Sequence, residues 1–121
     1  MKKLFLFLIL FLVSMLSFAD SRPIQIKNKG TVGDHSQYYP PADMPEVYYD
    51  SDNQEIIIVA DGFSSYYDVD IVSESTLMIV ISTQVDGYGD SIDISSLPDD
   101  NYTIVITSEY NNVFEGQFTN Y

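Results

Sequence analysis

Hydrophobic and polar residues alternate along much of the chain after residue 46, with the two-residue period of a β-strand. In the segment 66–72, Tyr67, Val69 and Ile71 share one face, and two aspartates lie on the other. Six further segments have the length and composition of strands: 46–50, 54–60, 76–83, 91–95, 102–108 and 113–119. No stretch beyond residue 19 has the 3.6-residue apolar period of a helix. The pattern predicts an all-β protein of about seven strands.

Two of these segments, 54–60 and 76–83, are continuous apolar runs rather than alternating ones. Such runs are typical of strands buried on both faces, so we expect them to be central strands. A short additional strand is predicted at 24–28, and Asn111-Asn112 indicates a tight hairpin. Regular short strands separated by turn residues favour an immunoglobulin-like β-sandwich of Greek-key type, with an up-and-down barrel as the alternative.

The first 19 residues have the parts of a secretory signal peptide. Two lysines precede an apolar run at 4–13, and Ser17-Phe18-Ala19 places small residues at a cleavage site. We therefore expect an exported protein, periplasmic, on the cell surface or extracellular. Because the chain has no cysteine, it is not predicted to be a lipoprotein. Residues 20–45 are interpreted as an N-terminal strand and a proline- and glycine-rich loop, and residues 46–121 as the body of the sandwich.

Charge is distributed very unevenly along the sequence. All five basic residues lie within the first 29 positions. Removing residues 1–19 takes away two of them and no acid, which leaves three basic residues against 18 acidic ones, a net charge of −15. Nucleic acids and anionic membranes are bound through clustered Lys and Arg, so neither is expected as a partner. Cations, cationic proteins and neutral glycans remain as candidates.

Few residues could support catalysis. Asp34, His35 and Ser36 combine the residue types of a nucleophilic triad, but neighbouring side chains point apart and cannot form a relay. Most of the acidic residues fall at outward strand positions or in turns. A carboxyl group there stays ionised, whereas a glycosidase needs one acid with a raised pKa. We therefore expect that the protein is not an enzyme.

Acidic turns point to calcium as the one cofactor to consider. Asp50 and Asp52 lie in one turn, and Asp86 and Asp90 lie in another. Calcium takes six to eight oxygen ligands, which carboxylates gathered at the ends of a sandwich could supply. We predict no cofactor, with calcium at these four residues as the alternative. Zinc lacks ligands, since the chain has one histidine and no cysteine.

Tyrosine is abundant: the chain has ten, and six of them form three adjacent pairs. In a strand, one member of each pair must face outward, where a tyrosine can stack on a sugar ring or anchor a protein. The members expected to be exposed are Tyr38, Tyr39, Tyr48 and Tyr66. These four are the predicted contacts to a partner, either a protein or a glycan. The sequence leaves the identity of that partner and the oligomeric state open.

The segment 96–106, SLPDDNYTIVI, predicts a corner between two strands. Leu97 is expected to pack into the core as one strand ends, and Pro98 stops the strand pairing. Tyr102 opens the next strand at the place of the tyrosine corner of immunoglobulin-type sandwiches, with its hydroxyl bonded to nearby backbone. The aspartates between Pro98 and Tyr102 are interpreted as the solvated outside of the turn.

The C-terminal part of the chain has a recognisable order of features. They are Ile94, the Leu97-Pro98 turn, Tyr102, the Asn111-Asn112 hairpin, and a strand in which Phe114, Gly116 and Phe118 alternate. This order resembles the C-terminal half of a family of small secreted Bacteroidetes proteins of unknown function. The resemblance implies an immunoglobulin-like sandwich and export, and it brings no activity. We expect a non-catalytic binding module, with a calcium-stabilised structural or adhesin-like domain as the alternative.

Overall fold

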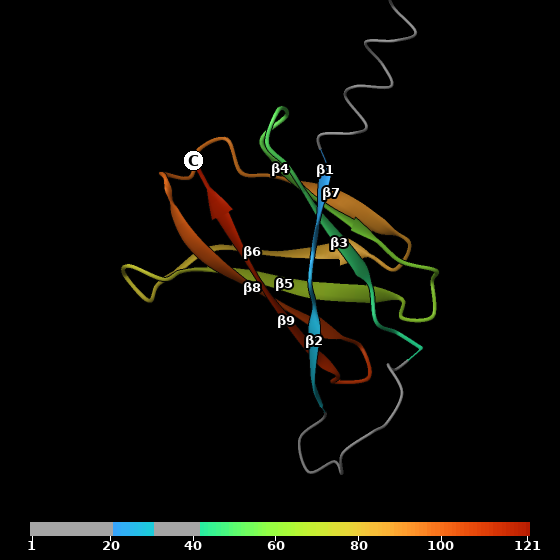
Figure 1. The fold of residues 1–121 in the computed structure, drawn as a ribbon. Helices are drawn as coiled ribbons and strands as arrows, with labels where there is room; N and C mark the ends of the chain where they lie inside the picture. Colours follow the sequence, from blue (N-terminus) through green and yellow to red (C-terminus); the bar gives the residue numbers. More distant parts are fainter. Residues whose placement is uncertain (1–20, 31–41) are drawn as a thin grey trace, which may run out of the picture.

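The computed structural model of the protein describes residues 21–30 and 42–121, which form nine β-strands in two sheets (Figure 1). The strands are β1 (Ser21–Ile24), β2 (Lys27–Gly30), β3 (Glu46–Asp50), β4 (Glu55–Val59), β5 (Tyr66–Ser73), β6 (Ile79–Asp86), β7 (Gly89–Asp93), β8 (Asp100–Ser108) and β9 (Val113–Asn120). One sheet has the order β1-β3-β4-β7 and the other β2-β9-β8-β5-β6, and all neighbouring strands are antiparallel. In these two ranges, no helix is long and apolar enough to cross a membrane.

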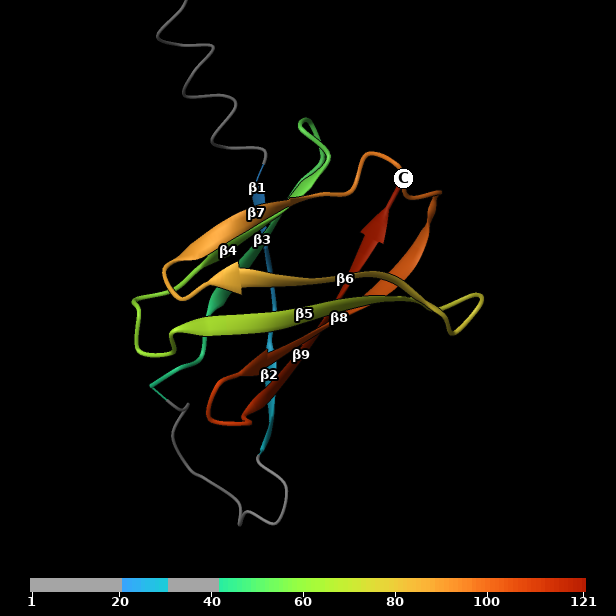
Figure 2. The same ribbon diagram turned by 180° about the vertical axis from the view of Figure 1, so that it is seen from behind.

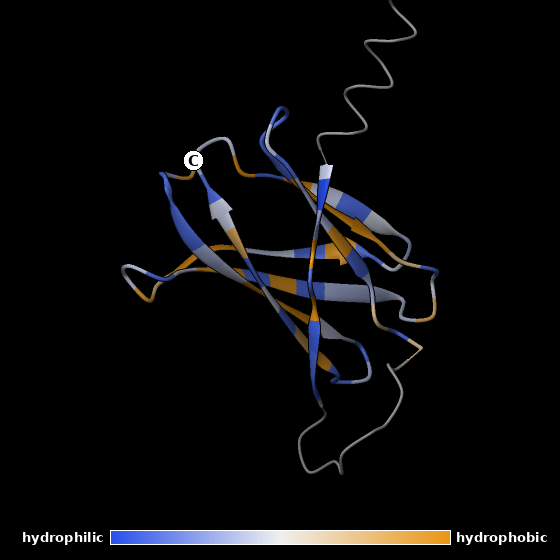
Figure 3. Cartoon of the chain, viewed as in Figure 1, coloured by the Kyte–Doolittle hydropathy of each residue, from blue (hydrophilic) through white to orange (hydrophobic). Residues whose placement is uncertain are grey.

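The core lies between the two sheets and is built from the inward faces of the alternating strands. The inward-facing apolar side chains of β5 and β8 are fully buried: Tyr67, Val69, Ile71, Tyr102, Ile104 and Ile106. They share one cluster with residues of the facing sheet, among them Val47 and Ile56. Figure 3 shows the corresponding alternation of hydrophilic and hydrophobic residues along the strands. The predicted inward faces of 66–72, 102–108 and 113–119 are confirmed.

The N-terminal segment differs from its prediction. Instead of one strand at 24–28, the chain forms β1 in the four-stranded sheet and β2 in the five-stranded sheet. The chain changes sheets at Gln25 and Ile26, where it passes directly over Gly116 of β9. A Cβ on Gly116 would lie 2.6 Å from Cδ1 of Ile26 and 3.0 Å from the carbonyl oxygen of Gln25. Residues 21–30 therefore belong to the sandwich, which begins before residue 46.

The two continuous apolar runs were expected to be central strands buried on both faces. β4 is a central strand of its sheet, as expected, but neither run is buried on both faces. In β4, Ile56 and Ile58 are buried, but Ile57 is half-buried and Val59 is exposed. The run at 76–83 begins in a turn and continues into β6, which is an edge strand and is mostly exposed. In the described part of the chain, neither outward face is covered by the second layer of structure that an apolar run by itself suggests. The apolar residues at 77–80 are exposed for this reason.

The predicted corner is present. Leu97 is half-buried against the core, and the hydroxyl of the buried Tyr102 donates a hydrogen bond to the carbonyl oxygen of Pro98 at 2.5 Å. Burial of Tyr102 raises the pKa of its hydroxyl, and the nearby carboxylates of Asp99 and Asp100 add to this effect. The hydroxyl therefore stays protonated and keeps donating over the physiological pH range.

Replacing Tyr102 by phenylalanine is expected to lower the free energy of unfolding by about 1 kcal/mol, the net value of one hydrogen bond. The ring remains and still stacks on Phe118, at 5.4 Å between ring centres. Urea denaturation followed by circular dichroism measures the difference. A variant as stable as the wild type would show that the corner contributes through packing alone.

Candidate functional site

The four tyrosines predicted to contact a partner do not gather on one surface. Tyr38 and Tyr39 lie outside the described residues. Tyr48 is on the outward face of β3 in the four-stranded sheet, half-buried, and its hydroxyl donates to Oε2 of Glu46 at 2.9 Å. Tyr66 is exposed at the start of β5 in the five-stranded sheet. Both side chains face outward as expected, although only Tyr66 is fully exposed. The two residues belong to opposite sheets and form no common site.

Exposed aromatic rings gather instead on the connections at one end of the sandwich. Phe63, Tyr88 and Tyr110 are 55%, 73% and 52% exposed. They lie on the β4–β5, β6–β7 and β8–β9 connections; Figure 1 shows the first two at the right of the molecule and the third below them. We call these three side chains the aromatic loop surface.

Backbone hydrogen bonds join the first two of these connections. The amide of Gly62 donates to the carbonyl oxygen of Gly87 at 3.0 Å, and the amide of Gly87 donates to the carbonyl oxygen of Ser65 at 3.0 Å. The amide of Ala60 donates to the carbonyl oxygen of Tyr88 at 3.3 Å. The segment 60–65 and the turn that carries Tyr88 are therefore held as one unit.

The third connection is joined to the same unit through Ser64 and Glu109. The buried hydroxyl of Ser64 donates to the carbonyl oxygen of Tyr66 at 2.6 Å and accepts from the amide of Glu109 at 3.1 Å. The Glu109 carboxylate accepts from the amide and the hydroxyl of Ser65, at 2.9 and 3.1 Å. All three connections are thus cross-bonded, so their side chains are presented in a fixed arrangement.

The rings themselves are also supported. Phe63 and Tyr110 contact each other with 5.6 Å between ring centres and a tilt of 54°, and the Tyr110 hydroxyl donates to the Phe63 carbonyl oxygen at 3.4 Å. The ring of Tyr88 packs against Gly62, where a Cβ would lie 2.6 Å from the ring carbon Cζ. Gly62 has a φ of +84°, so both its conformation and the ring require glycine.

Carboxylates surround the aromatic loop surface. Asp61 accepts a hydrogen bond from the amide of Phe63, and Asp86 accepts one from the amide of Tyr88, at 3.1 and 2.9 Å. The charge of Glu109 raises the pKa of Tyr110, so this phenol stays neutral and can donate. Behind the surface, burial raises the pKa of Tyr67 to about 12, with the charges of nearby acids as lesser causes. The surface is therefore aromatic and anionic.

None of these three aromatic residues was predicted from the sequence. The predicted exposed tyrosines belong to adjacent pairs, whereas each of these three rings lies alone in a connection. The usable signal was a bulky ring among turn-forming residues, as in DGYGD at 86–90 and EYNN at 109–112. A large aromatic side chain in a tight turn has little core within reach.

The four acids considered for calcium are placed at two ends of β4. The β3–β4 turn, with Asp50 and Asp52, adjoins Glu55 at the start of that strand, whereas Asp86 and Asp90 adjoin Val59 at its end. Asp50 is buried and caps its own turn, accepting from the amides of residues 52 and 53 at 3.1 and 3.2 Å. No three His, Cys, Asp or Glu residues within 21–30 and 42–121 are placed to hold a metal ion together.

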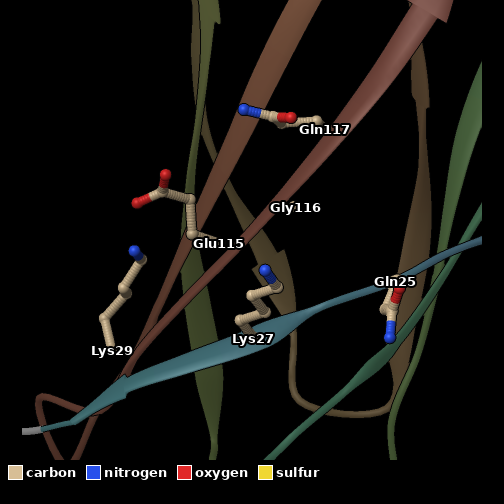
Figure 4. A pocket seen from close by; sticks show the side chains of 6 residues that line it. All are labelled: Gln25, Lys27, Lys29, Glu115, Gly116 and Gln117. Carbon is tan, nitrogen blue, oxygen red and sulfur yellow. The ribbon is translucent and has the colours of Figure 1, made fainter.

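An open polar groove of about 350 Å³ runs between β2 and β9. Its lining residues are Gln25, Lys27, Lys29, Glu115, Gly116 and Gln117 (Figure 4). Figure 4 shows the Lys29 side chain extending toward Glu115. The groove holds two of the three basic residues that follow the predicted signal peptide. The segment Asp34-His35-Ser36 lies outside the described residues.

Comparison of this chain with known proteins identifies its fold. No protein-family model matches the chain, and no curated protein matches it. Among solved structures, the chain is similar to a DUF3244 family protein with an immunoglobulin-like β-sandwich fold from Bacteroides vulgatus. The TM-score is 0.65 at 12% sequence identity, and the match covers 84% of this chain and 99% of that chain. The predicted immunoglobulin-like sandwich is confirmed.

Proposed function

We propose that this chain is an exported, non-catalytic binding module that holds an uncharged glycan on the aromatic loop surface. The observation that carries the proposal is the set of three exposed rings on three cross-bonded connections. Export is supported by the signal-peptide pattern of residues 1–19. A binding role is supported by the immunoglobulin-like sandwich, in which loops gather at the two ends.

The chemistry of the surface suits a sugar. The C–H face of a pyranose ring packs on an aromatic ring, and the phenol of Tyr88 adds a polar tip to its apolar ring. The carboxylates of Asp61, Asp86 and Glu109 are acceptors for sugar hydroxyl groups. Because the connections are already ordered, little conformational entropy is lost on binding.

Charge narrows the class of glycan. The rings are surrounded by carboxylates, and the sequence has no Lys or Arg after Lys29. A sulfated or uronic-acid glycan would therefore be repelled, with a strength that falls as salt rises. An uncharged glycan meets no such repulsion, which is why we propose this class.

A glycan array followed by titration calorimetry tests the proposal. We expect binding to neutral glycans and none to sulfated or uronate-containing ones. Tyr88→Ala and Phe63→Ala should each weaken binding by up to about tenfold, since contact with an aromatic ring contributes roughly 0.5–1.5 kcal/mol. Tyr121→Ala, which removes an exposed tyrosine at the C-terminus, is the matched control and should bind normally.

Two results would overturn the proposed function. One is an array without any bound neutral glycan at high protein concentration. The other is neutral-glycan binding that survives both Tyr88→Ala and Phe63→Ala, which would place the glycan elsewhere on the molecule.

A further inference from the structure

A second exposed surface lies at the other end of β5. The tip of the β5–β6 hairpin carries four consecutive apolar residues, Leu77, Met78, Ile79 and Val80, which are 81%, 66%, 58% and 38% exposed. We call them the apolar hairpin. Figure 2 shows the hairpin projecting from the sandwich on the side opposite the β6–β7 turn. Single exposed apolar residues are common on protein surfaces, but a contiguous exposed apolar patch often marks an interaction site.

The hairpin is held rigidly by polar contacts at its base. The amide of Ser73 donates to the carbonyl oxygen of Met78 at 2.9 Å, which closes the turn. One carboxylate oxygen of Asp100 accepts from the hydroxyls of Ser73 and Ser75, at 2.6 and 2.5 Å. The amide of Glu74 donates to the carbonyl oxygen of Asn101 at 2.9 Å. Asp100 was interpreted from the sequence as solvated, but it fixes this hairpin to β8.

The conformation of Leu77 points to a role other than stability. Its φ is +60°, a left-handed value that a leucine rarely adopts. The side chain is also largely exposed, so packing against the core does not compensate for the unfavourable backbone. Strained residues that the surrounding structure holds in place occur preferentially at functional positions.

The apolar hairpin continues into a sheet edge. Among residues 21–30 and 42–121, β6 is the last strand of the five-stranded sheet; it pairs with β5 on one side, and no described strand covers its other side. Its sequence, IVISTQVD, contains neither the lysine nor the proline that commonly protects an edge from pairing. An extended segment of another chain can add to such an edge through backbone hydrogen bonds, with side-chain contacts giving the specificity.

The negative charge around this edge determines which kind of segment can bind to it. Asp68 and Asp70 of β5 face outward beside β6, where they accept from Gln84 at 3.1 Å and Ser82 at 2.6 Å. Asp86 ends β6, and Glu74 lies in the hairpin. A second copy of the chain would bring an equally acidic edge against this one. A segment with Lys or Arg beside its apolar residues would be attracted instead.

We propose that the apolar hairpin and the edge of β6 bind an extended segment of a partner protein in which apolar and basic residues alternate. The apolar hairpin and the aromatic loop surface lie at opposite ends of β5, so a variant of either can be tested without changing the other. The edge of β6 runs between them and ends at Asp86, beside the turn with Tyr88. The protein would then connect a glycan at one end to a protein partner at the other.

The test uses the protein with 15N labelling and a synthetic ten-residue peptide of alternating valine and lysine. On titration we expect shifts of the amide signals of β6 and residues 77–80, and none at 60–65. A peptide with glutamate in place of lysine should bind at least fivefold more weakly. A peptide N-methylated at alternate residues, which cannot form the backbone ladder, should also bind at least fivefold more weakly.

Variants of the apolar hairpin complete the test. Met78→Ser combined with Ile79→Ser should raise the Kd of the valine–lysine peptide at least fivefold. Val59→Ser, at an exposed apolar position of the other sheet, should leave the Kd unchanged. Circular dichroism and glycan binding verify that both variants are folded.

Three results would overturn the inference. They are equal binding of the lysine and glutamate peptides, a dimer in sedimentation that the hairpin variant dissociates, and flotation of the wild type with phosphatidylcholine vesicles that the hairpin variant abolishes. The second result would make a further copy the occupant, and the third would make it a lipid surface.

Discussion

Replacing Gly89 by alanine is expected to lower the free energy of unfolding by about 3 kcal/mol, from backbone strain and overpacking together. Gly89 begins β7 with a φ of +103°, where an L side chain is strained. A Cβ there would lie 2.0 Å from the carbonyl oxygen of Ile58 and 3.0 Å from Cα of Val59. Both atoms are backbone of the paired strand β4, so relief of the contact requires the β4–β7 ladder to move.

Urea denaturation of the Gly89→Ala variant measures this loss. Ser91→Ala, an exposed position on the same strand, is the control and should change stability by no more than about 0.5 kcal/mol. A loss below about 1 kcal/mol for Gly89→Ala would mean that the ladder adjusts without strain, contrary to this prediction. Because Tyr88 precedes Gly89, glycan binding should be compared at temperatures at which the variant is folded.

Replacing Asn112 by alanine is expected to lower the free energy of unfolding by a similar amount, about 3 kcal/mol, because it removes a donor to a buried carboxylate. Asp43 is only 1% exposed, and both of its carboxylate oxygens accept from Nδ2 of Asn112, at 3.0 and 2.9 Å. The hairpin bonds between Ser108 and Asn112 use the backbone and survive the substitution. The loss therefore reports on the buried carboxylate.

A double-mutant cycle with Asp43→Ala separates this cause from a general effect on the hairpin. When the carboxylate is absent, Asn112→Ala should cost less than about 1 kcal/mol, since no buried charge is left without its donor. Strictly additive losses in the double variant would refute the coupling. Asp43→Ala keeps the main-chain carbonyl that accepts from the Tyr67 hydroxyl at 2.7 Å, so that contact is constant through the cycle.

Both predictions concern residues that hold the connections at the end of the sandwich with the aromatic loop surface. Gly89 allows the turn with Tyr88 to lie against β4, and Asn112 ties the turn with Tyr110 to the segment before β3. The aromatic loop surface therefore depends on buried backbone and carboxylate contacts that carry no aromatic residue themselves.

The strands and their inward faces could be predicted because the signal is local. In β5, β8 and β9 every second residue is apolar, and the side-chain direction in a strand alternates with the same period. The corner at Pro98 and Tyr102 was predictable for the same reason, since its two partners are four residues apart. The hairpin at Asn111, with a φ of 64°, is likewise encoded by the residue in the turn.

The runs at 54–60 and 76–83 show where local information ends. An apolar run shows that all its residues are hydrophobic. Whether the second face of the strand is buried depends on whether another layer covers that sheet. β6 lies at an edge, and no residue within the run encodes that position. The same limit applies to the site: Phe63, Tyr88 and Tyr110 are 22 to 47 residues apart, and only strand pairing brings their connections together.

By itself, the sequence determined the all-β class, the inward faces, the acidic surface and the corner at Tyr102, because each follows from the character of residues close together in the chain. Only the tertiary structure decided which strands lie at an edge, that Asp100 fixes a hairpin, and which aromatic rings share one surface. These features depend on contacts between residues distant in sequence, and their geometry is set by strand order and register.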